Sequence, residues 1–172
     1  MIKPSLFGFL SKMTEIVQNP INQVPIMTSY ILPSGEVNAS STNYGMGSRA
    51  WMAFNRNFDD SWFSNPSSST PQWLQYQFSS PKSISSYTLF MGGGIVSVVF
   101  PKAWTFEGSN NGTIWTILDT QTNQVLNSQV KQDFDLPNNA NYSYFRINNM
   151  VGSCSNIYYV TITEMEIIGT DI

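Results

Sequence analysis

The 172-residue chain contains no histidine and a single cysteine, Cys154. Serine, cysteine and metal-dependent hydrolases take their usual base or ligand from histidine, so the sequence offers none of these common catalytic systems. One cysteine cannot form an internal disulfide, and there is no cysteine and histidine cluster for zinc. The fold must therefore be held together by its hydrophobic core.

Charge is also scarce, since Asp, Glu, Lys and Arg together make up 11% of the residues. The 8 basic residues form no cluster and the net charge is −3, which excludes the electrostatic footprint of a nucleic-acid-binding or anionic-membrane-binding protein. No apolar run approaches the length of a membrane span. The 23 serines and 17 asparagines predict a surface of neutral polar groups.

Paired carboxylates are the remaining route to catalysis. Asp59 with Asp60, Asp133 with Asp135, and Glu164 with Glu166 could serve a glycosidase. Carboxylates this close in sequence are more typical of a solvated strand edge or a metal site. We therefore expect a protein that is not an enzyme.

Residues 1–27 are expected to form an N-terminal arm or linker ahead of a domain over residues 28–172. The run Leu6–Leu10 is short, contains a glycine and lacks a clear cleavage site, which argues against a secretory signal. Residues 2–18 could form a short amphipathic helix, either as a frayed leader or as an arm that docks on a partner or supports an oligomer. Pro20 and Pro25 bracket a predicted linker.

From Thr28 onward, short alternating segments separated by turn signals predict strands. Leu74, Tyr76 and Phe78 alternate with glutamines, and the strand is expected to end at 79–81. Further strands are expected at 84–90, 130–136, 142–148 and 157–168, with a turn at 137–141. This spacing predicts an all-β jelly-roll sandwich of about eight antiparallel strands with a short N-terminal extension.

The segment from Pro101 to Trp115 predicts a β-hairpin. Trp104 and Phe106 share one face of the first strand, because side chains alternate sides along a strand. Asn111 and Gly112 supply the positive backbone angles of a tight turn, and Trp115 begins the second strand. We expect Trp104, Trp115, Trp62 and Trp73 to pack in the core, and Arg146 to anchor a carboxylate or carbonyl.

Four motifs in order resemble the discoidin, or coagulation-factor C-type, superfamily of galactose-binding-like jelly rolls. The resemblance covers about residues 28–169. The motifs are Ala53-Phe54-Asn55-Arg56-Asn57 leading to Trp62, then Trp73-Leu74-Gln75-Tyr76-Gln77-Phe78, then Pro101 to Trp115, and finally Tyr144-Phe145-Arg146-Ile147 with Glu164 to Gly169. The resemblance implies a non-catalytic domain that binds a glycan, a lipid head group or a protein through loops at one end.

The resemblance also implies a structural calcium ion. Carried over to this chain, its oxygen ligands would be Asn55, Asn57, Asp60 and Glu164, with backbone carbonyls. The chain departs from the family pattern because Arg56 stands at the turn glycine and brings a positive charge. The alternative is an ordinary loop held by Asx turns.

Loop residues with aromatic rings or hydrogen-bonding groups are the candidate ligand contacts, because sugars bind aromatic faces flanked by polar groups. These candidates are Tyr44, Arg49, Trp51, Phe63 and Asn65. The apolar stretch 95–100 is a protein or membrane contact if exposed, and a strand if buried.

The sequence thus predicts a recognition module that binds carbohydrate on a cell surface or matrix, as part of a larger assembly. The alternative is a structural accessory or decoration protein of a virion or phage particle without sugar binding. Both place the chain on a virion or an extracellular surface, with a glycan or an assembly protein as partner.

Overall fold

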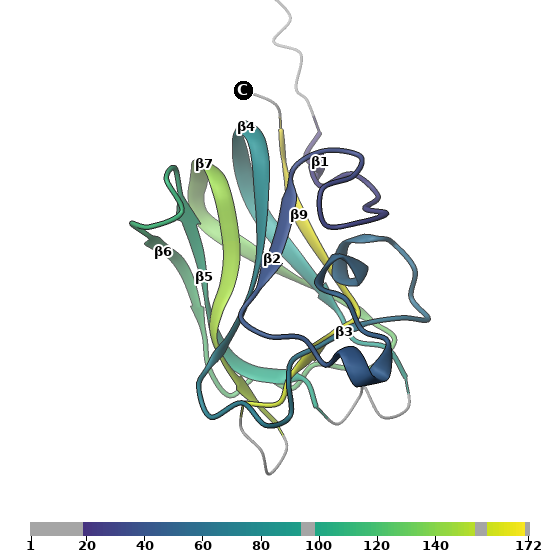
Figure 1. Ribbon diagram of the computed structural model, residues 1–172. Helices are drawn as coiled ribbons and strands as arrows, with labels where there is room; N and C mark the ends of the chain where they lie inside the picture. The colour runs from purple at the N-terminus through teal and green to yellow at the C-terminus, as the bar shows by residue number, and fades with distance from the viewer. Residues whose placement is uncertain (1–18, 94–98, 154–157, 171–172) are drawn as a thin grey trace, which may run out of the picture.

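The computed structural model describes residues 19–93, 99–153 and 158–170 and shows an antiparallel β-sandwich (Figure 1). The predicted helix at 2–18, residues 95–98 and Cys154 lie outside these ranges. Two short 3₁₀ helices, η1 and η2, accompany the strands. The elements are β1 (Ile21–Asn22), β2 (Glu36–Ala39), η1 (Tyr44–Met46), η2 (Ala50–Phe54), β3 (Trp62–Phe63), β4 (Gln72–Phe90), β5 (Pro101–Ser109), β6 (Thr116–Gln121), β7 (Lys131–Gly152), β8 (Thr161–Ile162) and β9 (Glu164–Thr170).

Two long strands, β4 and β7, run through the whole fold and join its two layers. The first part of β4 pairs with β2 and with the second part of β7, whose other neighbour is β5. The second part of β4 pairs with β9 and with the first part of β7. The strand order is therefore β1-β9-β4-β7-β5-β6, with β2 on β4 and a separate β3-β8 pair.

The strand end predicted at 79–81 and the turn predicted at 137–141 are both wrong, because β4 and β7 continue through these segments. The pairing instead shifts register, once between Gln77 and Lys82 and once between Ile84 and Ser86. Bulges of this kind bend a strand without ending it. Serine, proline and asparagine therefore mark bends here and not chain reversals.

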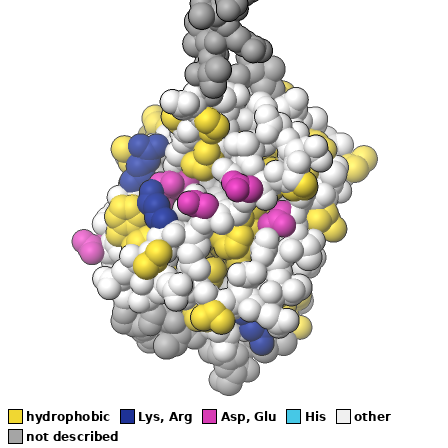
Figure 2. All heavy atoms as spheres, turned by 180° about the vertical axis from the view of Figure 1, so that it is seen from behind, with side chains coloured by type: hydrophobic (Ala, Val, Ile, Leu, Met, Phe, Trp, Pro, Cys, Tyr) yellow, Lys and Arg dark blue, Asp and Glu magenta, His cyan; other side chains and the backbone are white. Residues whose placement is uncertain are grey.

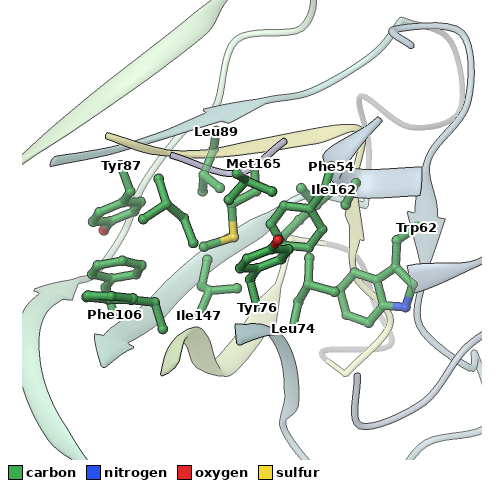
Figure 3. Close-up of a cluster of buried hydrophobic side chains, with 14 of the residues drawn as sticks. Phe54, Trp62, Leu74, Tyr76, Tyr87, Leu89, Phe106, Ile147, Ile162 and Met165 are labelled. Carbon is green, nitrogen blue, oxygen red and sulfur yellow. The ribbon is translucent and has the colours of Figure 1, made fainter. Parts of the chain in front are cut away.

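Aromatic side chains from both layers meet in the core (Figure 3). Tyr87 of β4 stacks on Phe106 of β5, with ring centroids 4.2 Å apart. The Tyr87 hydroxyl donates to Asp119 Oδ2 at 2.6 Å and accepts from Trp104 Nε1 at 2.8 Å, so its polar end is satisfied. Trp62 and Trp104 are buried as expected, but Trp73 and Trp115 are only half-buried, which corrects the prediction for these two.

The predicted hairpin is present as β5 and β6, with a longer turn than the sequence indicated. Ser109 Oγ accepts from the Gly112 N–H at 3.0 Å, and Asn111 Oδ1 accepts from the Ile114 N–H at 2.9 Å. Gly112 has a positive φ of 69°. Trp115 precedes β6, and the Arg146 guanidinium lies 3.8 Å from its ring centroid, which explains why Trp115 stays outside the core.

Residues 21–27, placed by the sequence in a linker, pack on the sandwich. Ile21 pairs with Gly169 and Asn22 with Ile168, so β1 lengthens the sheet beyond β9. Val24 and Met27 are each 1% exposed and belong to the core. The sandwich therefore begins before residue 28.

Candidate functional site

The short helices η1 and η2 gather with β3 and β8 at one end of the sandwich, called here the loop end (Figure 1). Ser48 Oγ accepts from the Phe63 N–H at 2.8 Å, and Phe63 O accepts from the Asn43 N–H at 2.8 Å. These bonds fix the segment that carries η1 against β3. Side chains on η1 are thereby held beside the end of the core.

Five side chains form what we call the loop-end cluster, which consists of Tyr44, Met46, Arg49, Phe63 and Tyr159. Tyr44 is 61% exposed, and the Arg49 guanidinium lies 5.0 Å from its ring centroid. The Tyr159 hydroxyl donates to Met46 Sδ at 3.4 Å, and the ring centroids of Tyr159 and Phe63 are 6.3 Å apart. The cluster combines exposed aromatic surface with a guanidinium donor.

A hollow of about 290 Å³ opens beside this cluster. Its lining includes the apolar side chains of Met46 and Phe63 and the carboxylates of Asp59 and Asp60. A site lined by both apolar and polar side chains can hold the apolar face of a sugar ring while it binds hydroxyls. The volume is slightly below that of common small-molecule sites.

The structure separates the five residues predicted as ligand contacts. Tyr44, Arg49 and Phe63 lie together in the loop-end cluster. Trp51 is half-buried and packs against the core. Asn65 Oδ1 accepts from the Ser67 N–H at 2.9 Å, so its carboxamide serves a local turn.

Sequence reasoning missed Met46 and Tyr159. The strand expected at 157–168 includes the adjacent tyrosines 158 and 159, whereas β8 begins only at Thr161. The predicted strand gives no sign of this contact, because Tyr159 and Met46 are 113 positions apart in the sequence. The available signal was an aromatic pair just before a strand.

Asp60 is the centre of the second predicted site, called here the acidic loop (residues 55–60). The carboxamides of Asn55 and Asn57 donate to the Asp60 carboxylate at 3.1 Å. Asn55 Oδ1 accepts from the Asn57 N–H at 2.8 Å and Asn57 Oδ1 from the Asp59 N–H at 3.2 Å. These are Asx turns, as in the alternative considered for this loop.

Glu164 joins the acidic loop to β9. Its side chain is 1% exposed, and Oε2 accepts from the Arg56 N–H at 2.9 Å. Within the described part of the chain, Oε1 is buried without a hydrogen-bond partner. Burial, helped by the neighbouring Glu166 carboxylate, raises the pKa of Glu164 to about 8.

A cation would coordinate the buried Glu164 Oε1. Whether a calcium ion fits the acidic loop therefore depends on this carboxylate. Hard oxygen atoms suit calcium, and Asn55, Asn57, Asp60 and Glu164 supply them. Across the described ranges, no three acidic, histidine or cysteine side chains come together, so amide and backbone oxygens would have to complete the set. Arg56, with φ of 57°, keeps the shape of the glycine turn, and its guanidinium donates to Val24 O at 3.2 Å.

Neutral polar groups cover most of the face seen in Figure 2, where acidic and basic side chains are few. The scarcity of charge on this face agrees with the composition, in which charged residues make up 11%. None of the helices in the described ranges has the length and apolar character to span a membrane.

Comparison with known families matches residues 36–163 to the F5/8 type C domain. No curated protein sequence matches the chain. The matched residues include the loop-end cluster and the acidic loop. The match ends at Thr163, one residue before Glu164.

Solved structures share the fold at low sequence identity. A family 32 carbohydrate-binding module of NanJ from C. perfringens, in complex with galactose, is 18% identical with a TM-score of 0.66, covering 78% of this chain and 93% of that one. A chitosan-binding module from a Paenibacillus chitosanase/glucanase is 23% identical with a TM-score of 0.65, covering 78% and 95%. The family 32 module of AlyQ, in complex with 4,5-unsaturated mannuronic acid, is 16% identical with a TM-score of 0.62, covering 82% and 97%.

Proposed function

The chain belongs to the F5/8 type C domain family, and we propose that it is a non-catalytic carbohydrate-binding module whose ligand lies against the loop-end cluster. The observation that carries this proposal is the cluster itself. Arg49 lies over the exposed Tyr44 ring, and Tyr159 donates to Met46, which lines the hollow. The sugar-binding neighbours named above support the ligand class.

Apolar side chains and hydrogen-bonding side chains at the loop end would make different contacts with a sugar. The tyrosine rings and Met46 offer apolar surface to the C–H face of a sugar, which water hydrates poorly. Arg49, whose Nη1 donates to Ser48 O at 2.6 Å, keeps further N–H groups for hydroxyl or carboxylate oxygens. Asp59 and Asp60 also line the hollow, where their carboxylates would accept hydrogen bonds from sugar hydroxyls.

Affinity measurements on two tyrosine variants test this placement. Tyr159→Ala should weaken binding to any glycan that the native chain retains by about fivefold, because an aromatic contact contributes about 1 kcal/mol. Tyr144→Ala is the matched control, since Tyr144 pairs with Ser109 at the far end of β5. Equal affinities for the native chain and Tyr159→Ala, with both variants folded by circular dichroism, would contradict the loop-end site.

We also propose that the acidic loop holds a structural calcium ion, with Glu164, Asp60, Asn55 and Asn57 among its ligands. The buried, unpartnered Oε1 of Glu164 supports this. The ion would coordinate this oxygen, which has no hydrogen-bond partner among the described residues, and would link the loop to β9. Melting curves with calcium and with a chelator should differ, and identical curves would contradict the proposal.

A second candidate function is decoration of a virion, phage particle or other assembly on an extracellular surface. It is favoured by exposed apolar side chains on the edge strand β6 and near it, since such side chains suit a protein contact. These are Ile114 at 75%, Ile117 at 60% and Val125 at 73% exposure. Incorporation into an assembly without any glycan binding would favour this function.

A further inference from the structure

A second hollow, of about 470 Å³, lies at the end of the sandwich opposite the loop end. Strand β5 runs between these two ends of the sandwich. Pro101 pairs with Gly152 at the loop end, and Ser109 pairs with Tyr144 at the end with the second hollow. The lining residues of this hollow come from the β5-β6 turn, from β6 and from the bend of β7. Its lining consists of Asn110, Ile117, Leu118, Pro137, Asn138, Asn139, Ala140, Asn141 and Tyr142.

A large bulge in β7 creates this hollow. Ser86 pairs with Asp135 and Ile84 with Ala140, so one residue of β4, Ser85, lies opposite the four residues 136–139 of β7. Bulges bend a strand and redirect its side chains. Here the bulge contains Asn138 and Asn139, both of which are exposed.

Four carboxamides line the hollow, and most of their hydrogen-bonding capacity is free. Asn110 Oδ1 accepts from the Ser143 N–H at 3.1 Å. In the ranges that the structure describes, no hydrogen bond occupies the side chains of Asn138, Asn139 and Asn141. Each carboxamide offers two donor hydrogens and an acceptor oxygen, which matches the mixed character of sugar hydroxyls.

Apolar side chains complete the lining, and no acidic or basic residue is part of it. Ile117 is 60% exposed. The Tyr142 ring packs edge-on against Phe145, with centroids 6.1 Å apart, and lies so close to Gly108 that a Cβ there would be 2.8 Å from Tyr142 Cγ. The Tyr142 ring is therefore fixed in place before any ligand arrives.

We propose that this hollow is a second binding site, for an uncharged saccharide. Free carboxamides beside an apolar wall select polyhydroxylated neutral ligands, whereas a charged ligand would find no counter-charge among the lining residues. The proposal goes beyond the loop-end function and shares with it only the class of ligand. With both sites, one chain can contact two glycan segments at opposite ends.

Nuclear magnetic resonance titration of the ¹⁵N-labelled full chain tests the two sites separately. The probes are galactose, mannose and cellotriose, with glucuronate as the charged comparison. We expect a neutral probe to shift the side-chain NH₂ signals of Asn138, Asn139 and Asn141 more than glucuronate does. Backbone signals of Met46, Phe63 and Tyr159 report the loop end independently.

A double variant provides the matched test. Asn138→Ala combined with Asn139→Ala should weaken binding at the hollow at least about tenfold, because two hydrogen-bonding groups are removed. Asn127→Ala, an exposed asparagine outside the hollow, should leave it unchanged. Loop-end shifts should be the same in all three chains.

The outcomes distinguish the two proposals. Shifts at the loop end without shifts at the hollow would overturn the second site and leave the loop-end function standing. Shifts at the hollow alone would support the second site and contradict the loop-end function. No shifts with any probe, or equal binding by the double variant and Asn127→Ala, would overturn the second site.

Discussion

At the scale of single residues, the ion pair between Glu107 and Arg146 joins β5 to β7 under Trp115. Arg146 Nη2 lies 2.7 Å from Glu107 Oε2, and Glu107 is 4% exposed. The prediction that Arg146 anchors a carboxylate is confirmed. Burial alone would raise the pKa of Glu107, but hydrogen bonds from Thr105 and Asn148 and the Arg146 charge together lower it below the ordinary value of 4.5.

Glu107 should therefore contribute to acid unfolding. Because its pKa is lowered in the folded state, its stabilisation is present above pH 4.5 and is lost as pH falls through the folded-state value. Glu107→Gln should lower the free energy of unfolding by about 3 kcal/mol at neutral pH, since it leaves Arg146 unpaired. Urea unfolding between pH 3 and pH 7 measures both effects. An unchanged acid limb in Glu107→Gln would contradict this role.

Arg56 should weaken cation binding in the acidic loop. Arg56→Gly removes a positive charge beside Glu164 and suits the φ of 57°. We expect calcium affinity to rise severalfold in calorimetric titration, while stability in chelator changes little. Lys102→Ala removes an exposed charge elsewhere and should not change the affinity. If neither the native chain nor Arg56→Gly binds calcium, the calcium proposal is wrong.

Single residues were predicted well where local pattern decides their environment. Trp104 and Phe106 are buried because they alternate toward the core along β5. The predictions for Trp73 and Trp115 were wrong. Trp73 alternates with the buried Leu74 and so lies on the other face of β4, and Trp115 precedes β6 and packs against the Arg146 guanidinium. Tyr159 was missed because its contact with Met46 is long-range and leaves no local signal.

At the scale of elements, the pairing of β9 with β4 depends on the absence of a side chain at Gly169. A Cβ there would overlap the Ser83 carbonyl oxygen and come within 2.9 Å of the Ile84 Cα. Gly169→Ala should therefore force the strands apart and lower the free energy of unfolding by about 2 kcal/mol. Gly93→Ala is the control, because its Cβ would meet only the Gln129 side chain, at 3.5 Å. Equal denaturation midpoints for the two variants would contradict this contact.

The positions of strands followed from alternation, but their continuity did not. Alternating residues located β4, β5 and β7, and the Asn-Gly pair located the hairpin turn. Pro81 predicted the end of a strand and Pro137 a turn, whereas both lie within long strands. A register shift is decided by the partner strand, so the sequence of one strand does not reveal it. The bulge that shapes the second hollow could not be predicted for this reason.

At the scale of the whole molecule, the sandwich includes residues that precede its predicted boundary. A chain that starts at residue 28 lacks β1 and the buried Val24 and Met27. Compared with a chain that starts at residue 19, it should lose about 3 kcal/mol of unfolding free energy through lost apolar burial. Thermal or urea unfolding of the two chains measures the difference. Matching stabilities would show that residues 19–27 do not stabilise the sandwich.

The central claim is that the chain recognises carbohydrate through its loop end, and a glycan array with the full chain tests it most directly. The array should carry galactose-, glucosamine- and uronate-terminated glycans and be probed with the native chain, Tyr159→Ala and Tyr144→Ala. The account predicts that the native chain and Tyr144→Ala retain the same glycans with equal signals and that Tyr159→Ala retains them with a clearly weaker signal. Absence of binding to every glycan, or undiminished binding by Tyr159→Ala, would contradict it.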